Sequence, residues 1–317
     1  MQTRASHQPD VGVGKLARLQ QVTTLGAPLL AALWAVGCWR NGFPVWAVAG
    51  VLLIVGGYAL VLGLEFVLLA RLHGDDPTPR AGKALLWRAW WGEVRAAPVV
   101  FCWRQPFASL AVADHLPAQA AGRRGVVLVH GFVCNRGIWN LWLHRLVKLD
   151  VPVVAVNLEP VFGSIDDYMA GIEAAVCRLE RCTGLAPVIV AHSMGGLAVR
   201  RWWAECGDVT RVQRLITLGS PHQGTWLARF SITRNARQIR PGSAWLKELA
   251  SRERPGHSAR VTCFFSHCDN IVFPPRHGVM TGADERHLTG VAHVHMADHP
   301  APWHELLHWL TSADTPR

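Results

Sequence analysis

The sequence predicts an α/β fold with a mostly parallel central sheet, preceded by two transmembrane helices. Three observations support this fold class. Two long segments near the N-terminus carry no charge, β-rich runs alternate with helical patterns from Gly125 onward, and one serine stands where a strand turns into a helix. Hydrophobic residues make up 50% of the 317 residues and charged residues only 17%, which is apolar for a purely soluble protein.

The first 72 residues are predicted to form a membrane hairpin. No charged residue occurs in residues 19–39 or 41–64, and each segment reaches the roughly 20 residues that a helix needs to cross a bilayer. The sequence RNGFP between them is typical of a tight turn. We therefore predict spans at about residues 19–39 and 44–70. A signal peptide would have one shorter apolar core, so the remaining alternative is a pair of buried core helices.

The basic residues beside the spans predict their orientation. Three precede the first span, one lies in the turn and four follow the second: Arg4, Lys15 and Arg18; Arg40; Arg71, Arg80, Lys83 and Arg88. Because such residues accumulate on the cytoplasmic side, we expect a multi-pass protein of the inner membrane whose globular part faces the cytoplasm. The eight scattered cysteines form no CxxC pair, which favours free, mostly buried thiols in a reducing compartment.

Residues 73–124 are predicted to form a linker and a candidate interfacial helix. The stretch HGDDPTP, residues 73–79, is rich in helix breakers. Apolar residues then recur at spacings of three and four, opposite Arg88 and Arg95: Leu86, Trp87, Trp90, Trp91 and Val94. This pattern fits equally well a helix lying in a membrane interface and a helix that packs on the following domain through its tryptophans.

Residues 125–317 are predicted to form the globular α/β domain. Strands are expected at residues 126–129, 151–156, 188–191, 214–218 and 261–265. Helical patterns cover residues 139–149, 168–182, 197–206 and 302–310. Nearly continuous apolar strands that alternate with helices are typical of a parallel sheet covered on both faces.

A serine corner lies in VIVAHSMGGLAVRRWW, residues 188–203. Where a strand runs into a helix through one residue, that residue is strained, its side chain is exposed, and its neighbours two positions away must be small. Ala191 and Gly195 meet this need around Ser193, although the common pattern has glycine at the position of Ala191. The strand before and the helix after make the motif specific, so we predict Ser193 as a nucleophile.

A nucleophilic serine needs a base to take its proton and an acid to orient that base. After such a corner the acid is expected first and the histidine second. Asp269 ends the strand pattern FFSHCD and is the predicted acid, with a turn or cap aspartate as the alternative. His293 follows LTGVA, interpreted as a short strand and turn, and is preferred as the base over His299. His304 and His308 fit one face of the closing helix.

Two backbone amides are predicted to bind the negative oxygen of a tetrahedral intermediate. One is the N–H of Met194, directly after the nucleophile. The second is the N–H of Phe132, in a loop where Gly131 permits close backbone approach. His130 is expected to brace this loop rather than to act as a base.

Five motifs together resemble the bacterial lipase/esterase branch of the α/β-hydrolase superfamily. They are VLVHGFVCNRGIWN, VIVAHSMGG, LGSPHQGT, CDNIVFP and LTGVAHV, in the proper order within residues 125–310. The resemblance implies a triad of Ser193, Asp269 and His293, no organic cofactor, and a supporting role for the loop at residues 219–225. We predict no metal site. Paired membrane spans are not part of the common secreted lipases, which argues against digestion of extracellular triglyceride.

An insertion at about residues 222–259 leaves the sheet pattern. Apolar side chains are mixed there with arginines: Trp226, Leu227, Phe230, Ile232, Trp245 and Leu246 with Arg229, Arg234, Arg237 and Arg240. Insertions of this kind commonly roof the site and form the acyl pocket. The arginines fit either contact with lipid phosphates or a solvated face.

These features predict a membrane-anchored serine hydrolase that cleaves carboxylic esters of apolar acyl chains. The net charge of +10 indicates an anionic partner surface, and without a nucleic-acid-binding signature membrane phospholipid is favoured over nucleic acid. A thioesterase or an acyltransferase would use the same triad. A membrane-bound binding module that has lost catalysis is disfavoured by the complete triad. The sequence identifies no protein partner.

Overall fold

The globular part of the chain is built on a six-stranded sheet in which every strand is parallel to its neighbours. The computed structural model describes residues 14–312, so Arg4 and residues 313–317 lie outside it. The strand order is β2-β1-β3-β4-β5-β6. The strands are β1 (Val126–Val129), β2 (Val153–Val156), β3 (Val188–His192), β4 (Arg214–Leu218), β5 (Val261–Phe265) and β6 (Asp284–His287). The predicted α/β fold with a mostly parallel sheet is confirmed.

Helices cover both faces of this sheet. Side chains alternate along each strand, so Val127 and Ile189 pack toward α6 and α7, whereas Val126 and Leu128 pack toward α5 and α10. The covering helices are α5 (Asn140–Lys148), α6 (Met169–Thr183), α7 (Met194–Cys206) and α10 (Pro300–Thr311). Because both faces are buried, the central strands are apolar at most positions, which explains their nearly continuous hydrophobic runs.

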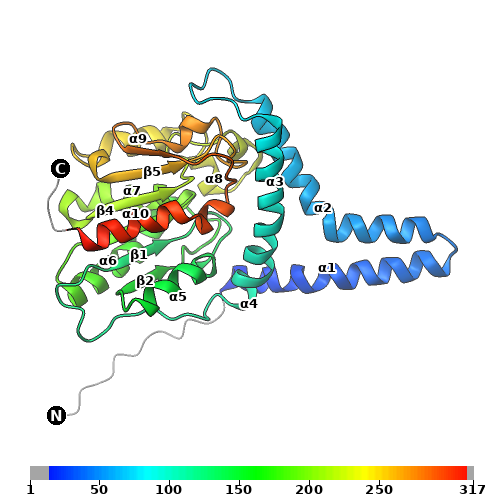
Figure 1. Cartoon of the computed structure of the whole chain (residues 1–317), viewed down its shortest axis with the longest axis horizontal. Helices are drawn as coiled ribbons and strands as arrows, with labels where there is room; N and C mark the ends of the chain where they lie inside the picture. Colours follow the sequence, from blue (N-terminus) through cyan, green and yellow to red (C-terminus); the bar gives the residue numbers. More distant parts are fainter. Residues whose placement is uncertain (1–13, 313–317) are drawn as a thin grey trace, which may run out of the picture.

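The N-terminal hairpin consists of α1 (Lys15–Arg40) and α2 (Pro44–Arg71), which project away from the globular part (Figure 1). The side chain of Asn41 donates to the carbonyl of Gly37 at 2.8 Å and caps α1, and Pro44 begins α2 where its missing N–H costs nothing. Both helices are long and apolar enough to cross a membrane, and only 6% of the most apolar window of each is buried. Core helices would be mostly buried, so that alternative does not fit.

Helix α3 (Lys83–Pro98) lies between the hairpin and the globular part (Figure 1). It continues into a π-helical segment, η1 (Val99–Arg104), and a short α4 (Gln105–Phe107). Trp90 packs inward and donates to the carbonyl of Ala59 at 3.0 Å, whereas Trp87 and Trp91 are exposed. One tryptophan of this helix is therefore fastened to α2, whereas the other two are exposed, and the interfacial role of the helix stays a prediction.

Two predictions made from the sequence are wrong. The segment before His293 is not a strand, because β6 is Asp284–His287 and residues 288–294 consist of turns and irregular chain. The strand β6 lies at the sheet edge and is largely exposed, and its sequence is DERH. Because none of these residues is apolar, the strand shows no hydrophobic pattern in the sequence. All eight cysteines are free, but only Cys134, Cys263 and Cys268 are buried, so the prediction of mostly buried thiols is wrong.

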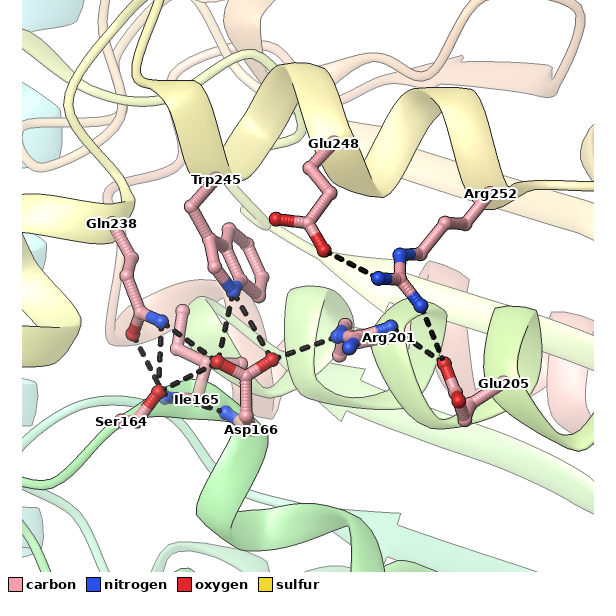
Figure 2. Close-up of polar contacts among 9 residues, drawn as sticks. All are labelled: Ser164, Ile165, Asp166, Arg201, Glu205, Gln238, Trp245, Glu248 and Arg252. Carbon is pink, nitrogen blue, oxygen red and sulfur yellow. Dashed lines mark hydrogen bonds and ion pairs between the residues drawn. The ribbon is translucent and has the colours of Figure 1, made fainter.

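The insertion folds as η5 (Trp226–Phe230), α8 (Arg234–Gln238), α9 (Ala244–Arg252) and η6 (Ser258–Arg260), with short 3-10 helices at both ends. Asp166, in the 3-10 helix η3 (Ile165–Tyr168), fastens it to the domain (Figure 2). Its carboxylate accepts from Arg201 at 2.7 Å, Trp245 at 3.2 Å and Gln238 at 3.1 Å. Arg240 donates to carbonyls of the insertion itself, so this arginine is structural.

Candidate active site

The serine corner is a one-residue bend between β3 and α7. The backbone of Ser193 has φ 55° and ψ −133°, and residues other than glycine rarely adopt a positive φ. Its N–H donates to the carbonyl of Leu218 at 2.8 Å, which holds the bend against β4. A Cβ at Gly195 would overlap the backbone carbonyl of His130, so only glycine fits there. The strain is therefore supported by packing on both sides.

Asp269 and His293 form an ion pair beside this corner. Nδ1 of His293 lies 3.0 Å from both carboxylate oxygens of Asp269, and both residues are buried. Asp269 Oδ1 also accepts the N–H groups of Ile271 and Val272 at 2.9 and 2.8 Å. These bonds fix the carboxylate, which in turn fixes the orientation of the histidine ring. Nε2, the ring nitrogen that does not contact Asp269, is left for another partner.

The electrostatic surroundings favour a protonated His293. Burial alone would lower its pKa, but the Coulombic attraction and the hydrogen bond of Asp269 outweigh burial, and Glu93 and Glu65 add to the effect. The pKa of His293 is therefore raised above its ordinary value of 6.5. A histidine with this environment stabilises the imidazolium that forms when it takes a proton.

Two other histidines near the corner are neutral. His192 lies with its ring 4.6 Å from that of His293, and burial lowers its pKa to about 3. His130 contacts the backbone with both ring nitrogens, at Gly131 and Leu158, and burial lowers its pKa to about 4. His130 thus has the contacts expected of a loop-bracing residue.

The loop after β1 carries the second predicted amide donor. Gly131 lies against the serine, because a Cβ there would be 2.6 Å from Cβ of Ser193. Val133 has φ 53°, which is rare for a β-branched residue, so the loop is held in a strained shape. Within residues 14–312, the N–H groups of Phe132 and Met194 donate to no other group. Both amides are free to bind a negative oxygen.

A cavity of about 270 Å³ brings these groups together. Ser193, His293 and Phe132 line it, and among the described residues Ser193 and His293 are not yet hydrogen-bonded to each other. Such bonds often tighten only when substrate binds. The N-terminal helices supply much of the remaining wall: Leu62, Glu65, Glu93, Ala97 and Phe101. No described residue of the insertion lines this cavity, so the expectation that residues 222–259 form its acyl pocket is not met.

Three polar residues of the site escaped the sequence analysis. Glu93 is buried and accepts the N–H groups of Val294 and His295 at 2.9 and 3.0 Å. Asn270 accepts the N–H of His293 at 3.2 Å and donates to Glu65 at 2.6 Å. A signal existed for Glu65, because a lone acid at the end of an apolar helix is costly and usually functional.

The other candidate histidines lie elsewhere. His299 caps α10 by accepting the N–H of Ala301 at 3.2 Å, and His304 and His308 lie on that helix. His222 contacts Thr217 and Arg200 and so stabilises the loop at residues 219–225. Within residues 14–312, no group of histidine, cysteine, aspartate and glutamate side chains is arranged to hold a metal ion.

The sequence matches the alpha/beta hydrolase family over residues 126–315, more than half of the chain, and the protein belongs to this family. Among solved structures it resembles the mature lipase BlEst2 of Bacillus licheniformis, with 16% identity and a TM-score of 0.55 over 63% of this chain and 97% of that one. It also resembles Aspergillus fumigatus lipase B, with 17% identity and a TM-score of 0.55 over 97% of this chain and 84% of that one. No curated protein matches the sequence. At these identities the similarity establishes the fold.

Proposed function

We propose that this protein is a membrane-anchored serine hydrolase that cleaves carboxylic esters of apolar acyl chains, with Ser193, His293 and Asp269 as its triad. One observation carries the proposal. The strained Ser193 and His293, whose Nδ1 is paired with Asp269, line one cavity together with Phe132. The N–H groups of Phe132 and Met194 have no partner among the described residues. This set of groups is the one that acyl transfer through a serine requires.

The reaction follows from the positions of these groups. Oγ of Ser193 attacks the ester carbonyl while Nε2 of His293 takes the hydroxyl proton, and the carbonyl electron pair moves onto oxygen. The N–H groups of Phe132 and Met194 bind this oxyanion. The intermediate collapses, the leaving alcohol takes the proton from His293, and an acyl-serine remains. Water repeats the sequence, which releases the carboxylic acid and restores the serine.

The hairpin is proposed to anchor the enzyme in the inner membrane. The spans α1 and α2 expose apolar side chains along most of their length, as lipid-facing helices do. Exposed Trp87 and Trp91 on α3 suit the polar–apolar boundary of a bilayer. The basic residues flanking the spans support an orientation with the globular part on the cytoplasmic side. An apolar ester is then concentrated in the same membrane as the enzyme.

The full-length protein in detergent or nanodiscs tests this proposal. It should react with a fluorophosphonate probe and hydrolyse p-nitrophenyl esters of graded chain length. Ser193→Ala should abolish both reactions and leave circular dichroism unchanged, because a small hydroxyl contributes little to stability. Labelling of Ser193→Ala at the full rate would refute the assignment. Probe labelling of the wild-type protein without ester hydrolysis would favour a thioesterase or acyltransferase. The absence of both labelling and hydrolysis would favour a binding module.

A further inference from the structure

A second cavity, called the groove below, lies inside the triangle formed by α1, α2 and the end of α3. Its volume is about 780 Å³, within the range of about 300–1,000 Å³ that ligand pockets typically have. The walls come from residues 20–28 of α1, 54–62 of α2 and 97–102 of α3 and η1. Figure 1 shows how the triangle arises, because α2 runs beside α1 and then turns along α3. Apart from Gln20, Thr23, Thr24 and Tyr58, the groove is lined by apolar residues, proline and one cysteine.

Hydrogen bonds fasten all three corners of this triangle. Gln20 of α1 donates to Gln105 at 2.8 Å, next to the end of η1. The hydroxyl of Tyr58 in α2 donates to the carbonyl of Val94 in α3 at 2.9 Å. At the hairpin tip, the indole of Trp34 donates to the carbonyl of Trp46 at 2.8 Å. Polar bonds of this kind are hard to replace in an apolar medium, so the groove is a built feature.

The groove adjoins the cavity at Ser193. Leu62, Ala97 and Phe101 line both spaces, one from each of α2, α3 and η1. All three side chains are apolar, and Ala97 is small, so the boundary between the two spaces presents only apolar surface to a hydrocarbon chain. The polar groups of the cavity at Ser193 lie on one side of this boundary, and an open apolar groove between two helices with exposed apolar side chains lies on the other.

We propose that this groove is the acyl-chain site of the enzyme and that it admits a membrane lipid sideways from the bilayer. The ester carbonyl lies at Ser193, and the chain passes Leu62, Ala97 and Phe101 into the space between α1 and α2. The occupant is the acyl chain of a bilayer lipid, because both helices that bound the groove are exposed along apolar faces. The inference rests on the proposed function, since it takes Ser193 as the nucleophile.

A pair of matched substitutions in α1 tests the groove. Ala27 lines it, whereas Ala32 is exposed on the same helix and does not. For full-length protein in nanodiscs, Ala27→Trp should lower the ratio of kcat/KM for p-nitrophenyl palmitate over butyrate by roughly tenfold or more, because each methylene displaced from apolar contact loses a factor of about four. Ala32→Trp should leave this ratio unchanged. Fluorophosphonate labelling of Ser193 shows that each variant is folded.

A photoreactive inhibitor provides an independent measurement. A long-chain alkyl fluorophosphonate with a diazirine near the chain end forms a P–O bond with Ser193 and releases fluoride. On irradiation it should crosslink to peptides containing residues 20–28 or 54–62. Crosslinks to residues 222–259 instead, or equal selectivity in the two tryptophan variants, would overturn the groove while leaving the hydrolase intact. Wild-type protein that hydrolyses neither ester and reacts with no probe would overturn the proposed function, and the groove with it.

Discussion

Replacement of Glu93 by glutamine should change how the stability of the protein depends on pH. Glu93 is 1% exposed, and its carboxyl accepts two backbone N–H groups from the segment that carries His293. Burial raises its pKa from 4.5 to about 7, against the opposing effect of these two hydrogen bonds. Glutamine has nearly the same shape and keeps one acceptor oxygen but cannot ionise.

The size of the effect follows from this pKa shift. Because the folded protein keeps a proton that the unfolded chain has released, the cost of burying the carboxylate grows from pH 4.5 and is complete above pH 7. Wild-type protein should therefore lose about 2–3 kcal/mol of stability between pH 5 and pH 8 through this group. The glutamine variant should not lose it. The amide of glutamine is a weaker hydrogen-bond acceptor than the carboxyl, which lowers the stability of the variant by about 1–3 kcal/mol at every pH.

Thermal unfolding of the full-length protein in detergent measures this difference. Between pH 5 and pH 8, the Tm of wild type should fall by roughly 5–10 °C more than that of Glu93→Gln, by the scaling for a domain of this size. Glu248→Gln, at a side chain that is about half exposed, removes the same charge from the surface and should follow wild type. If Tm changed with pH in the same way for wild type and Glu93→Gln, the claim that Glu93 is buried with a raised pKa would be refuted.

Three further outcomes are expected. His293→Ala should cost several orders of magnitude in ester turnover, whereas His299→Ala should cost stability of about 1 kcal/mol in α10 and little activity; the reverse order would exchange their roles. The kcat/KM profile should fall tenfold per pH unit below the raised pKa of His293, since the base must be neutral, and Asp269→Asn should move that kinetic pKa downward; an unmoved profile would remove Asp269 from the triad. A C-terminal alkaline phosphatase fusion should be inactive and a green fluorescent protein fusion should fluoresce in the membrane fraction, whereas an active phosphatase would reverse the orientation.

The parts of the fold that follow local patterns were predictable from the sequence. The five buried strands are apolar at nearly every position, and the corner at Ser193 needs small neighbours that the sequence shows directly. The strand β6 escaped because it lies at the sheet edge, where Asp284, Glu285, Arg286 and His287 pack on little and leave no hydrophobic period. The two expected halves of the membrane hairpin fell within a few residues of α1 and α2 for the same local reason.

The walls of the site were not predictable, because they depend on contacts between distant segments. Glu93 meets Val294 across 201 residues and Glu65 meets Asn270 across 205. No spacing within either helix shows which loop it will contact. The expected acyl pocket in residues 222–259 failed for a related reason. That insertion is fastened through Asp166 to α7, and part of the wall of the cavity at Ser193 comes instead from helices that precede the domain.

The N-terminal helices and the cavity at Ser193 form one structural unit. If α2 served only to hold the protein at the bilayer, its contacts with the domain would lie away from the cavity. Instead, Glu65 binds Asn270, the neighbour of Asp269, and Leu62 belongs to the wall beside Ser193. Helix α3 adds Glu93, whose carboxyl holds the two amides that follow His293. A chain cut before α3 would lose part of the wall and the partner of Asn270, so its activity would differ from that of the whole protein even in free solution. The same helices carry the long apolar faces and hold the loop of His293, so under the proposed function the position of the bilayer is coupled to the geometry around Ser193.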